Sequence, residues 1–359
     1  MSRAKRFRSH RYSRPITRIL IGCVATALTL TSCADNSEQL DEGKELPTTV
    51  ADGVELSLAT ARTKVALTAN GDIDKLPFTV TNWAAISGGP DVIQAFKGGS
   101  VDLATNAGVP PIQAHAQGLD AKIVGVSVRT WPIYKLATAP GTHISSVQDL
   151  RGKKIAFSPG QAQGVVVLRT LKAAGIDIDE VKLVELNGPQ FLTALQGKQV
   201  DVAPLSEPSL TKYLDQYAAD GARGVHTDAV DALSILWAPS TVLADDKKLS
   251  AITEFVKYWA KGEVWQWENQ AKWIDTYYVK DQGVTPEDGR RIIATLGQPY
   301  FPTDWTDAIT WEQETIDLVT DAGQLGGTSF DANTLFDRRF EKVVADAVPE
   351  KYRSEPVAS

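Results

Sequence analysis

The sequence predicts an α/β protein built from two lobes, and three observations lead to that prediction. The chain has 359 residues, of which 43% are apolar and 23% charged, proportions that suit two globular domains of roughly 150 residues each. One motif occurs twice, as GPDVIQAFKGGSVDLA over 89–104 and as GPQFLTALQGKQVDVA over 188–203. A strand pattern precedes each copy, so each half contains a β-α-β unit, the building block of a parallel sheet covered by helices.

Residues 1–32 have the pattern of a signal peptide. A basic run through Arg18 precedes the mostly apolar stretch from Ile19 to Leu30, which is shorter than the roughly 20 residues that span a bilayer. Leu30-Thr31-Ser32-Cys33 resembles the lipobox of bacterial lipoproteins, which implies that Cys33 becomes the lipidated first residue of the mature protein. The alternative is a plain signal peptide with an incidental cysteine. We therefore expect an extracytoplasmic protein that touches the membrane through its lipid anchor only.

Residues 33–53 are predicted to form a flexible acidic tether. Six acidic residues accompany the single base Lys44, and large apolar residues are almost absent, so this segment is expected to bury too little surface to fold by itself.

The charge balance and the cysteine count exclude several classes of protein. The net charge is −7, but the predicted leader holds seven of the 37 bases and none of the 44 acids, so the mature chain carries −14. This excess of acid argues against nucleic acid or an anionic membrane surface as a partner. Two cysteines and four scattered histidines predict neither a metal cluster nor a disulfide framework, and no cofactor is expected.

The remaining elements follow in chain order. Strands are predicted over 78–83, 122–128, 154–157 and 182–186, and a helix over 165–174. In each copy of the repeat, Gly-Pro opens a helix, a glycine ends it, and a strand containing Val-Asp follows. Beyond Trp237, apolar residues at helical spacing predict long amphipathic helices. Six of the nine tryptophans lie in that region, where we expect them to pack in the core rather than to form a carbohydrate or cofactor site.

Three motifs resemble a known family. They are GGSVDL over 98–103, VPPI over 109–112 and DLRGKKIAF over 149–157, and shorter matches continue through Val200-Asp201. They resemble the solute-binding proteins of bacterial ABC importers, in the branch that handles aliphatic sulfonates, taurine and nitrate. The resemblance implies a type II periplasmic-binding-protein fold, with two doubly wound lobes, a small-molecule ligand in the cleft between them, and permease and ATPase subunits as partners.

The resemblance also sets the expected domain limits. The crossover segments between the lobes are predicted near Tyr134 to Gly141 and Leu233 to Thr241. Lobe 1 is then discontinuous and consists of 54–139 and 238–346, lobe 2 is 140–237, and 347–359 form a tail.

The ligand is expected where strands end and helices begin, because helix N-termini present unpaired N–H groups and a partial positive charge. The predicted ligand-binding residues occupy such positions in both lobes: Thr60, Ala61, Arg62, Ser87, Gly88, Gly89, Asn106, Ala107, Gly108, Arg129, Trp131, Ser158, Gln161, Gln163, Gly164 and Glu207. Arg62 and Arg129 could grip a carboxylate or sulfonate with their guanidinium forks, or could be solvated surface arginines. Glu207 could receive a cationic or hydroxyl group of the ligand or could cap a helix.

The predicted function is capture of a small organic anion, an aliphatic sulfonate in the first place, for delivery to an importer. The chain departs from the family pattern at Gln161, Ala162 and Gly164, where sulfonate binders commonly have a Ser-Ser pair and a histidine, and at Gly108, where they have an acid. A bulkier or less charged solute is therefore an alternative, as are an aromatic or pyrimidine-type solute and a sensor lipoprotein without an importer. The chain contains no GxxxxGK, G-x-S-x-G or H-E-x-x-H motif, so we do not expect an enzyme.

Overall fold

The structure is a computed structural model that describes residues 40–353 except 87, 130 and 328. The chain divides into two units, and the description that follows concerns the second, Glu38–Ser359. The predicted signal peptide and Cys33 lie outside the described residues. Within the described ranges, no helix is both long and apolar enough to cross a membrane.

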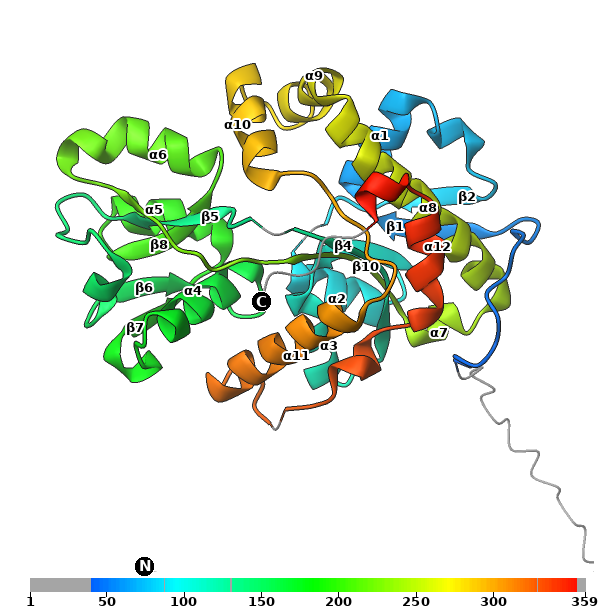
Figure 1. Cartoon of the computed structure of the whole chain (residues 1–359), viewed down its shortest axis with the longest axis horizontal. Coiled ribbons are helices and arrows are strands. Elements are labelled where there is room, and N and C mark those ends of the chain that lie inside the picture. The colour runs from blue at the N-terminus through cyan, green and yellow to red at the C-terminus, as the bar shows by residue number, and fades with distance from the viewer. Residues whose placement is uncertain (1–39, 87, 130, 328, 354–359) are drawn as a thin grey trace, which may run out of the picture. The chain divides into compact units, whose positions relative to one another are not determined.

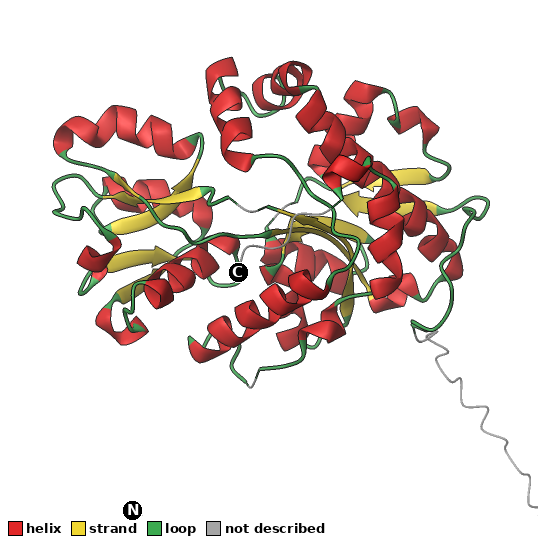
Figure 2. Cartoon of the chain, viewed as in Figure 1, coloured by secondary structure: helices red, strands yellow, loops and turns green. Residues whose placement is uncertain are grey.

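Two five-stranded sheets with the same strand arrangement form the centres of two lobes (Figures 1 and 2). The order is β2-β1-β3-β10-β4 in lobe 1 and β7-β6-β8-β5-β9 in lobe 2. In each sheet the first three strands are parallel, and the fourth in spatial order, β10 or β5, runs antiparallel to its neighbours. The strands are β1 Glu55–Ala59, β2 Thr79–Trp83, β3 Leu103–Ala107, β4 Ala121–Val128, β5 Tyr134–Thr138, β6 Lys154–Phe157, β7 Lys182–Glu185, β8 Val202–Ser206, β9 Gly224–Val225 and β10 Leu233–Pro239.

The two copies of the sequence repeat occupy equivalent places in the two sheets. Each copy contributes a helix that leads into the third strand of its sheet, β3 or β8. The aspartate of each Val-Asp pair ties the incoming strand to its neighbour: Asp102 accepts a hydrogen bond from the backbone N–H of Ser57 at 2.8 Å, and Asp201 accepts one from Lys154 at 2.8 Å. The two copies are therefore similar in structure as well as in sequence.

Helices cover both sheets (Figure 2). They are α1 Ala61–Asn70, α2 Gly89–Lys97, α3 Val109–Ala116, α4 Ala162–Ala173, α5 Phe191–Gln196, α6 Ser209–Tyr217, α7 Ser240–Leu243, α8 Asp246–Glu268, α9 Gln270–Trp273, α10 Pro286–Leu296, α11 Thr306–Asp321 and α12 Glu341–Asp346. The long helices predicted beyond Trp237 are confirmed as α8 and α11. The apolar residues that predicted α8, from Leu249 to Trp259, are buried, because this face of the helix packs on lobe 1.

The chain passes between the sheets earlier than the sequence predicts. Residues 134–138 and 233–239, predicted as crossover segments, are strands β5 and β10, and each is hydrogen-bonded within one sheet. The passage occurs between Val128 and Tyr134 and again between Val225 and Leu233. The proposed lobe limits at 139/140 and 237/238 thus fall one strand too late, since an apolar strand pattern does not reveal the sheet with which it pairs.

Two segments, predicted as a flexible tether and as a tail, make contacts with lobe 1 in their described parts. In the described part of the acidic segment, Leu40, Leu46 and Val50 pack against the core, and Arg339 donates hydrogen bonds to the carbonyls of Asp41 and Lys44 at 3.0 and 2.9 Å. These partners are nearly 300 residues apart in the chain, so composition alone could not reveal the contact. The predicted tail 347–359 likewise contains a buried residue, Tyr352, whose carbonyl accepts a hydrogen bond from the Phe301 amide.

Candidate functional site

A cavity between the lobes, which we call the interlobe cavity, gathers six of the predicted site residues. Its lobe 1 wall contains Gly88, Gly89, Asn106 and Ala107, and its lobe 2 wall contains Gln161 and Gln163. Other lining residues are Ala85, Ile86, Pro90, Asp91, Pro110, Ala162, Asn187, Gly188, Pro189 and Ser209. The Gly-Pro pairs of both repeat copies therefore line the same cavity. The sequence did not predict that the two pairs come together.

Helix N-termini supply most of the polar character of the interlobe cavity. Gly88 precedes α2, Gln161 precedes α4, and Ser209 begins α6, so N–H groups without an intrahelical partner surround the space. The Gln163 side chain approaches Gly188 and makes no hydrogen bond within the described residues, which leaves its amide available to a solute. Asn106 is oriented by Trp237, whose indole N–H donates to its Oδ1 at 2.8 Å.

Helices of the two lobes contact each other at two places. At one, the Arg169 guanidinium of α4 lies 3.7 Å from the ring centroid of Trp311 and donates to Thr315 Oγ1 at 2.7 Å, both on α11. At the other, Lys212 of α6 lies 3.5 Å from Asp288 of α10. These contacts join lobe 2 to the C-terminal helices of lobe 1.

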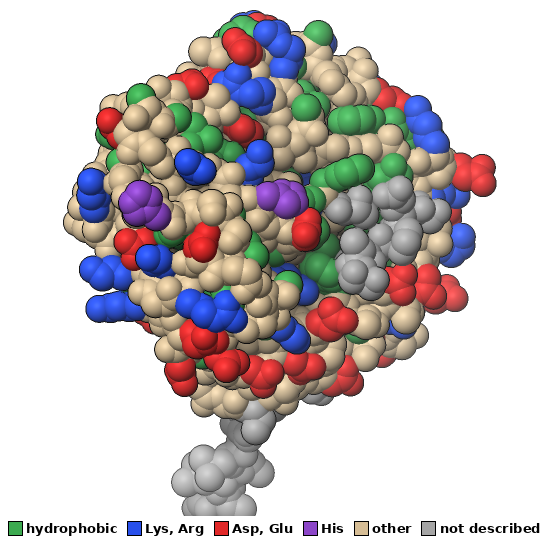
Figure 3. Space-filling model, turned by 60° about the vertical axis from the view of Figure 1, so that its left-hand side comes forward, with side chains coloured by type: hydrophobic (Ala, Val, Ile, Leu, Met, Phe, Trp, Pro, Cys, Tyr) green, Lys and Arg blue, Asp and Glu red, His purple; other side chains and the backbone are tan. Residues whose placement is uncertain are grey.

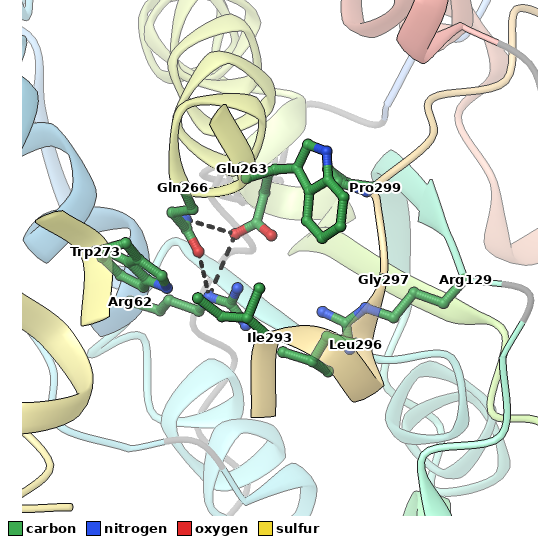
Figure 4. A pocket seen from close by; sticks show the side chains of 10 residues that line it. Arg62, Arg129, Glu263, Gln266, Trp273, Ile293, Leu296, Gly297 and Pro299 are labelled. Carbon is green, nitrogen blue, oxygen red and sulfur yellow. Dashed lines mark hydrogen bonds and ion pairs between the residues drawn. The ribbon is translucent and has the colours of Figure 1, made fainter. Parts of the chain in front are cut away.

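A second cavity, which we call the arginine pocket, contains the two predicted arginines (Figure 4). Arg62 comes from the first turn of α1, and Arg129 follows the end of β4. Helices α8, α9 and α10 and the residues after α10 complete the wall with Glu263, Gln266, Trp267, Trp273, Ile293, Leu296, Gly297 and Pro299. The sequence analysis assigned these arginines to the cleft together with the glycine loops, and the structure separates them from those loops.

The two arginines have different environments. Arg62 Nε donates to Gln266 Oε1 at 2.6 Å and lies 3.7 Å from Glu263 Oε1, and its guanidinium stands 5.6 Å from the Trp273 ring centroid. Arg129 makes no hydrogen bond or ion pair with its side chain among the described residues. Burial, followed by the charge of Arg62, lowers the pKa of Arg129, while Glu263 and Asp231 oppose the shift. The pocket thus holds two cations and one carboxylate.

The other predicted site residues contact neighbouring protein groups or lie at the surface. Ser158 is buried and donates to Gln161 Oε1 at 2.9 Å, and Gly164 lies against the Ser158 carbonyl. Thr60 is buried before α1, and Ala61 is the exposed first residue of that helix. Trp131 is 62% exposed and contacts Gly297 at the edge of the arginine pocket. Ser87 lies outside the described residues.

Gly108 and Glu207 contact acidic or basic side chains of the C-terminal helices. The Glu312 carboxylate of α11 lies against Gly108, and a Cβ at Gly108 would be 2.6 Å from Glu312 Oε2. Glu207 accepts a hydrogen bond from Thr211 at 2.9 Å and lies 4.0 Å from Arg291 of α10. The Thr211 bond joins two side chains, and no side chain caps α6, so the helix-cap alternative for Glu207 gains no support; the second oxygen of Glu207 is buried without a hydrogen bond in the described part of the chain.

The sequence analysis missed the contributions of the C-terminal helices. Trp267 and Trp273 were expected only to pack in the core, but both line the arginine pocket, although Trp273 is also buried. Their helical spacing gave no signal for this role. Asn187 and Gly188 could have been found, because Gly188 is the repeat counterpart of Gly89. Over the described residues, no cluster of three or more His, Cys, Asp or Glu side chains could hold a metal ion.

The surface charge adds to this description. On the face shown in Figure 3, acidic and basic side chains are intermingled, with a group of acidic side chains near the lower edge. An anion would therefore be attracted by local donors rather than by the net charge.

Comparison with known proteins places the resemblance on residues 83–234, which match the family model described as NMT1/THI5 like. A putative aliphatic sulfonates-binding protein of Escherichia coli K12 is 30% identical over 134 residues, which cover 37% of this chain and 42% of that protein. One of Bacillus subtilis 168, with the same name, is 23% identical over 200 residues, covering 54% and 58%. The chain thus spans about half the length of the curated relatives it matches, and its predicted resemblance to sulfonate-binding proteins is confirmed.

Solved structures show the same fold over more of the chain. The periplasmic aliphatic sulphonate binding protein SsuA of Escherichia coli has a TM-score of 0.68 at 21% identity, covering 80% of this chain and 98% of that one. The alkanesulfonate-binding SsuA of Xanthomonas axonopodis pv. citri, bound to MOPS, has a TM-score of 0.67 at 20% identity over 79% and 98%. A mutant of DSZB, in complex with biphenyl-2-sulfinic acid, has a TM-score of 0.57 at 15% identity over 81% and 98%. The predicted periplasmic-binding-protein fold is therefore confirmed.

Proposed function

We propose that this protein is the extracytoplasmic solute-binding component of an ABC importer and that it captures a small organic anion, an aliphatic sulfonate in the first place, in the interlobe cavity. One observation carries the proposal: every residue that lines this cavity lies within residues 83–234, the segment that matches the family model. Both curated relatives are named as aliphatic sulfonate-binding proteins. The part of the chain that matches the family model is thus the part that builds the described wall of this cavity.

The chemistry of the cavity supports an anionic solute. Helix N-termini from both lobes offer N–H donors and a partial positive charge, which suit the oxygens of a sulfonate or carboxylate group. The amide of Gln163 adds a neutral donor. Asp91 lies on the wall as well and would repel an anion placed beside it, so we expect the charged group nearer to Gln163 and Gly188.

The position of the cavity supports a transport role. A solute held by donors from both lobes stabilises the closed arrangement of the lobes, and importer subunits can recognise that arrangement. No chemical step is part of this role, and we propose that the protein is not an enzyme. The thiols of the chain, Cys23 and Cys33, both lie before the described residues.

The ligand can be tested by thermal unfolding of the protein from Ala34 onward, without lipid. The panel comprises alkanesulfonates, taurine, nitrate, aromatic carboxylates and neutral pyrimidines. A compound at 100 times its Kd stabilises the native state by about 2.7 kcal/mol. Gln163→Ala should reduce the shift caused by an alkanesulfonate, whereas Gln94→Ala, on the exposed face of α2, should leave it unchanged.

Each outcome of this panel has a distinct meaning. A shift by alkanesulfonates that depends on Gln163 supports the proposal. A shift by pyrimidines or aromatic carboxylates alone would contradict the sulfonate assignment and favour the alternative solutes. Uptake of the bound compound by cells that carry the neighbouring permease and ATPase, and loss of uptake without this protein, would separate an importer component from a sensor.

We also propose that the mature protein is anchored through lipid on Cys33. The lipobox-like sequence before this residue supports the proposal. Cys33→Ser should release the protein from the membrane fraction, and labelling with a radioactive fatty acid should be lost in the same variant. Membrane association that survives the substitution would contradict it.

A further inference from the structure

Glu207, a predicted site residue, has no part in the proposed function. It does not line the interlobe cavity, although Ser209, two residues further along the chain, does. Its Oε2 instead lies 4.0 Å from Nε of Arg291, on helix α10 of lobe 1. Both atoms are buried, and neither has a hydrogen-bond partner within the described residues. Such a pair of unbonded atoms needs an explanation, because a buried polar group without a partner is costly.

The other polar atoms of both side chains are bonded within their own lobes. On lobe 2, Thr211 donates to Oε1 of Glu207 at 2.9 Å. On lobe 1, the Nη groups of Arg291 donate to Glu287, at 3.1 Å, and to Asp288. Each side chain is therefore oriented by its own lobe and keeps one atom for a partner in the other lobe. Their separation of 4.0 Å exceeds the length of an N–H···O hydrogen bond by only about 1 Å.

Helix α10 belongs firmly to lobe 1, so the distance between Glu207 and Arg291 reports the distance between the lobes. Ile292 and Ile293 of α10 pack in one buried cluster with Trp273 and Tyr278. In Figure 1, α6 and α10 lie next to each other along the upper edge of the molecule, and the ion pair between Lys212 and Asp288 joins them.

The two places where the lobes meet differ in tightness. Between α4 and α11, Arg169 donates to Thr315 at 2.7 Å and its guanidinium lies 3.7 Å from the Trp311 ring centroid. Between α6 and α10, the ion pairs measure 3.5 and 4.0 Å, which is longer than the roughly 2.7–2.9 Å of a charged hydrogen bond. A rotation of lobe 2 about the α4–α11 contact that moves α6 toward α10 would shorten both pairs.

We propose that Glu207 and Arg291 form a latch, which closes into a charged hydrogen bond when the lobes close around a solute and separates when they open. The proposal rests on the proposed function, since the solute of the interlobe cavity draws the lobes together. It adds that the attraction between these two side chains influences the distance between the lobes even without a solute.

The distance between the lobes can be measured by pulsed electron paramagnetic resonance on the protein from Ala34 onward. Both cysteines of the sequence precede Ala34, so Asp74→Cys on lobe 1 and Gln196→Cys on lobe 2 can carry the two spin labels. Both positions are exposed, and we use this doubly labelled protein as the parent of all variants.

The first measurement needs no solute. Glu207→Lys places a cation opposite Arg291, so the distance between the labels should become longer than in the parent. Glu185→Lys is the matched control, because it makes the same charge change at an exposed position on lobe 2 and should leave the distance unchanged. Adding Arg291→Gln to Glu207→Lys should restore the parent distance, because the repelling cation is gone. A general folding defect would not be reversed in this way.

The second measurement is isothermal titration with butanesulfonate. Glu207→Gln and Arg291→Gln should each weaken its binding about fivefold, because each removes a charged hydrogen bond that only the closed state makes. The double variant should be no weaker than the weaker of the two, since both substitutions remove the same bond. Arg290→Gln, at an exposed position of α10, should bind like the parent.

The two measurements separate this proposal from the proposed function. If Glu207→Lys leaves the distance without solute unchanged, the latch is refuted, whatever butanesulfonate does. If the distance lengthens and Arg291→Gln restores it, but no alkanesulfonate binds, the latch is supported and the sulfonate assignment fails. If butanesulfonate binds and the effects of Glu207→Gln and Arg291→Gln on its affinity simply multiply, the two residues act independently and the latch is contradicted.

Discussion

Glu312 is a buried carboxyl group whose protonation should control how stability depends on pH. Only 1% of its surface is exposed, its Oε1 has no hydrogen-bond partner within the described residues, and the negative charge of Asp231 lies nearby. Burial, reinforced by Asp231 and opposed by Arg169, raises the pKa of Glu312 from 4.5 to about 8. The carboxyl group therefore keeps its proton in the folded protein at pH values at which the unfolded chain has lost it.

The sign and the size of the effect follow from this difference. Between pH 4.5 and about 8 the folded state binds more protons than the unfolded state, so the free energy of unfolding decreases as the pH rises through this window. A tenfold difference in proton affinity between the two states corresponds to about 1.4 kcal/mol, which gives about 4 to 5 kcal/mol over the whole window and about 3 kcal/mol between pH 5 and pH 8. Glu312→Gln keeps the shape of the side chain and removes the titration.

Urea unfolding followed by tryptophan fluorescence at pH 5, 6, 7 and 8 would measure the effect. Relative to the wild type, Glu312→Gln should gain about 3 kcal/mol between pH 5 and pH 8. Glu314→Gln is the control, because Glu314 is 56% exposed on the same helix and should give no such trend. Asp231, whose pKa burial raises to about 6, titrates in both proteins and largely cancels in the difference. A stability difference that stays constant from pH 5 to pH 8 would refute the reasoning and show that Glu312 is ionised in the folded protein.

Two further predictions concern packing and charge in lobes 2 and 1. Gly164→Ala would place a Cβ 2.3 Å from the backbone carbonyl oxygen of Ser158, so it should lower the free energy of unfolding in urea by about 1–3 kcal/mol. Gly262→Ala is the control, because its new Cβ would have its nearest contact at 3.7 Å, and it should be neutral or stabilising. Equal effects of the two substitutions would contradict the argument. Arg339→Ala leaves the fully buried Asp337 unpaired and should cost about 3–5 kcal/mol, and adding Asp337→Asn should recover part of this loss. In both Arg339 variants, hydrogen exchange over residues 40–46 should become faster, and unchanged exchange would show that Arg339 does not hold that segment.

The sequence predicted those elements whose signal is local. The strands β4 and β6 were predicted within one residue of their observed limits, and the Gly-Pro helix opening was correct for α2. In the second copy, Gly188–Gln190 form a 3₁₀ turn before α5, so the same dipeptide starts a slightly different structure. Residues 134–138, predicted as part of a crossover segment, form strand β5, and the sheet they join depends on partners far along the chain, so the lobe limits differ from those predicted.

The candidate site, like the fold, was predictable only where the signal in the sequence is local. Loops after strands can be read from the sequence, and six residues predicted on that basis do line the interlobe cavity. Which loops face each other depends on how the C-terminal helices pack, and that packing placed Arg62 and Arg129 in a separate pocket with Gln266 and Trp273. Helical periodicity identifies the apolar face of a helix, but it does not tell a tryptophan in the core from one at a pocket wall.

The two cavities differ in the groups that they would offer to an anion. The interlobe cavity contains no Lys or Arg among its described lining residues and relies on helix N-termini and amides, whose effect decays within the first turn of each helix. The arginine pocket instead presents the charged groups of Arg62, Arg129 and Glu263. The whole chain carries −7, and −14 without the predicted leader, so neither cavity would gain from the long-range field, and selectivity is expected to arise from contacts within a few ångströms. For the anion proposed to bind in the interlobe cavity, we expect the wall residues Gln163 and Gly188 to contribute to selectivity.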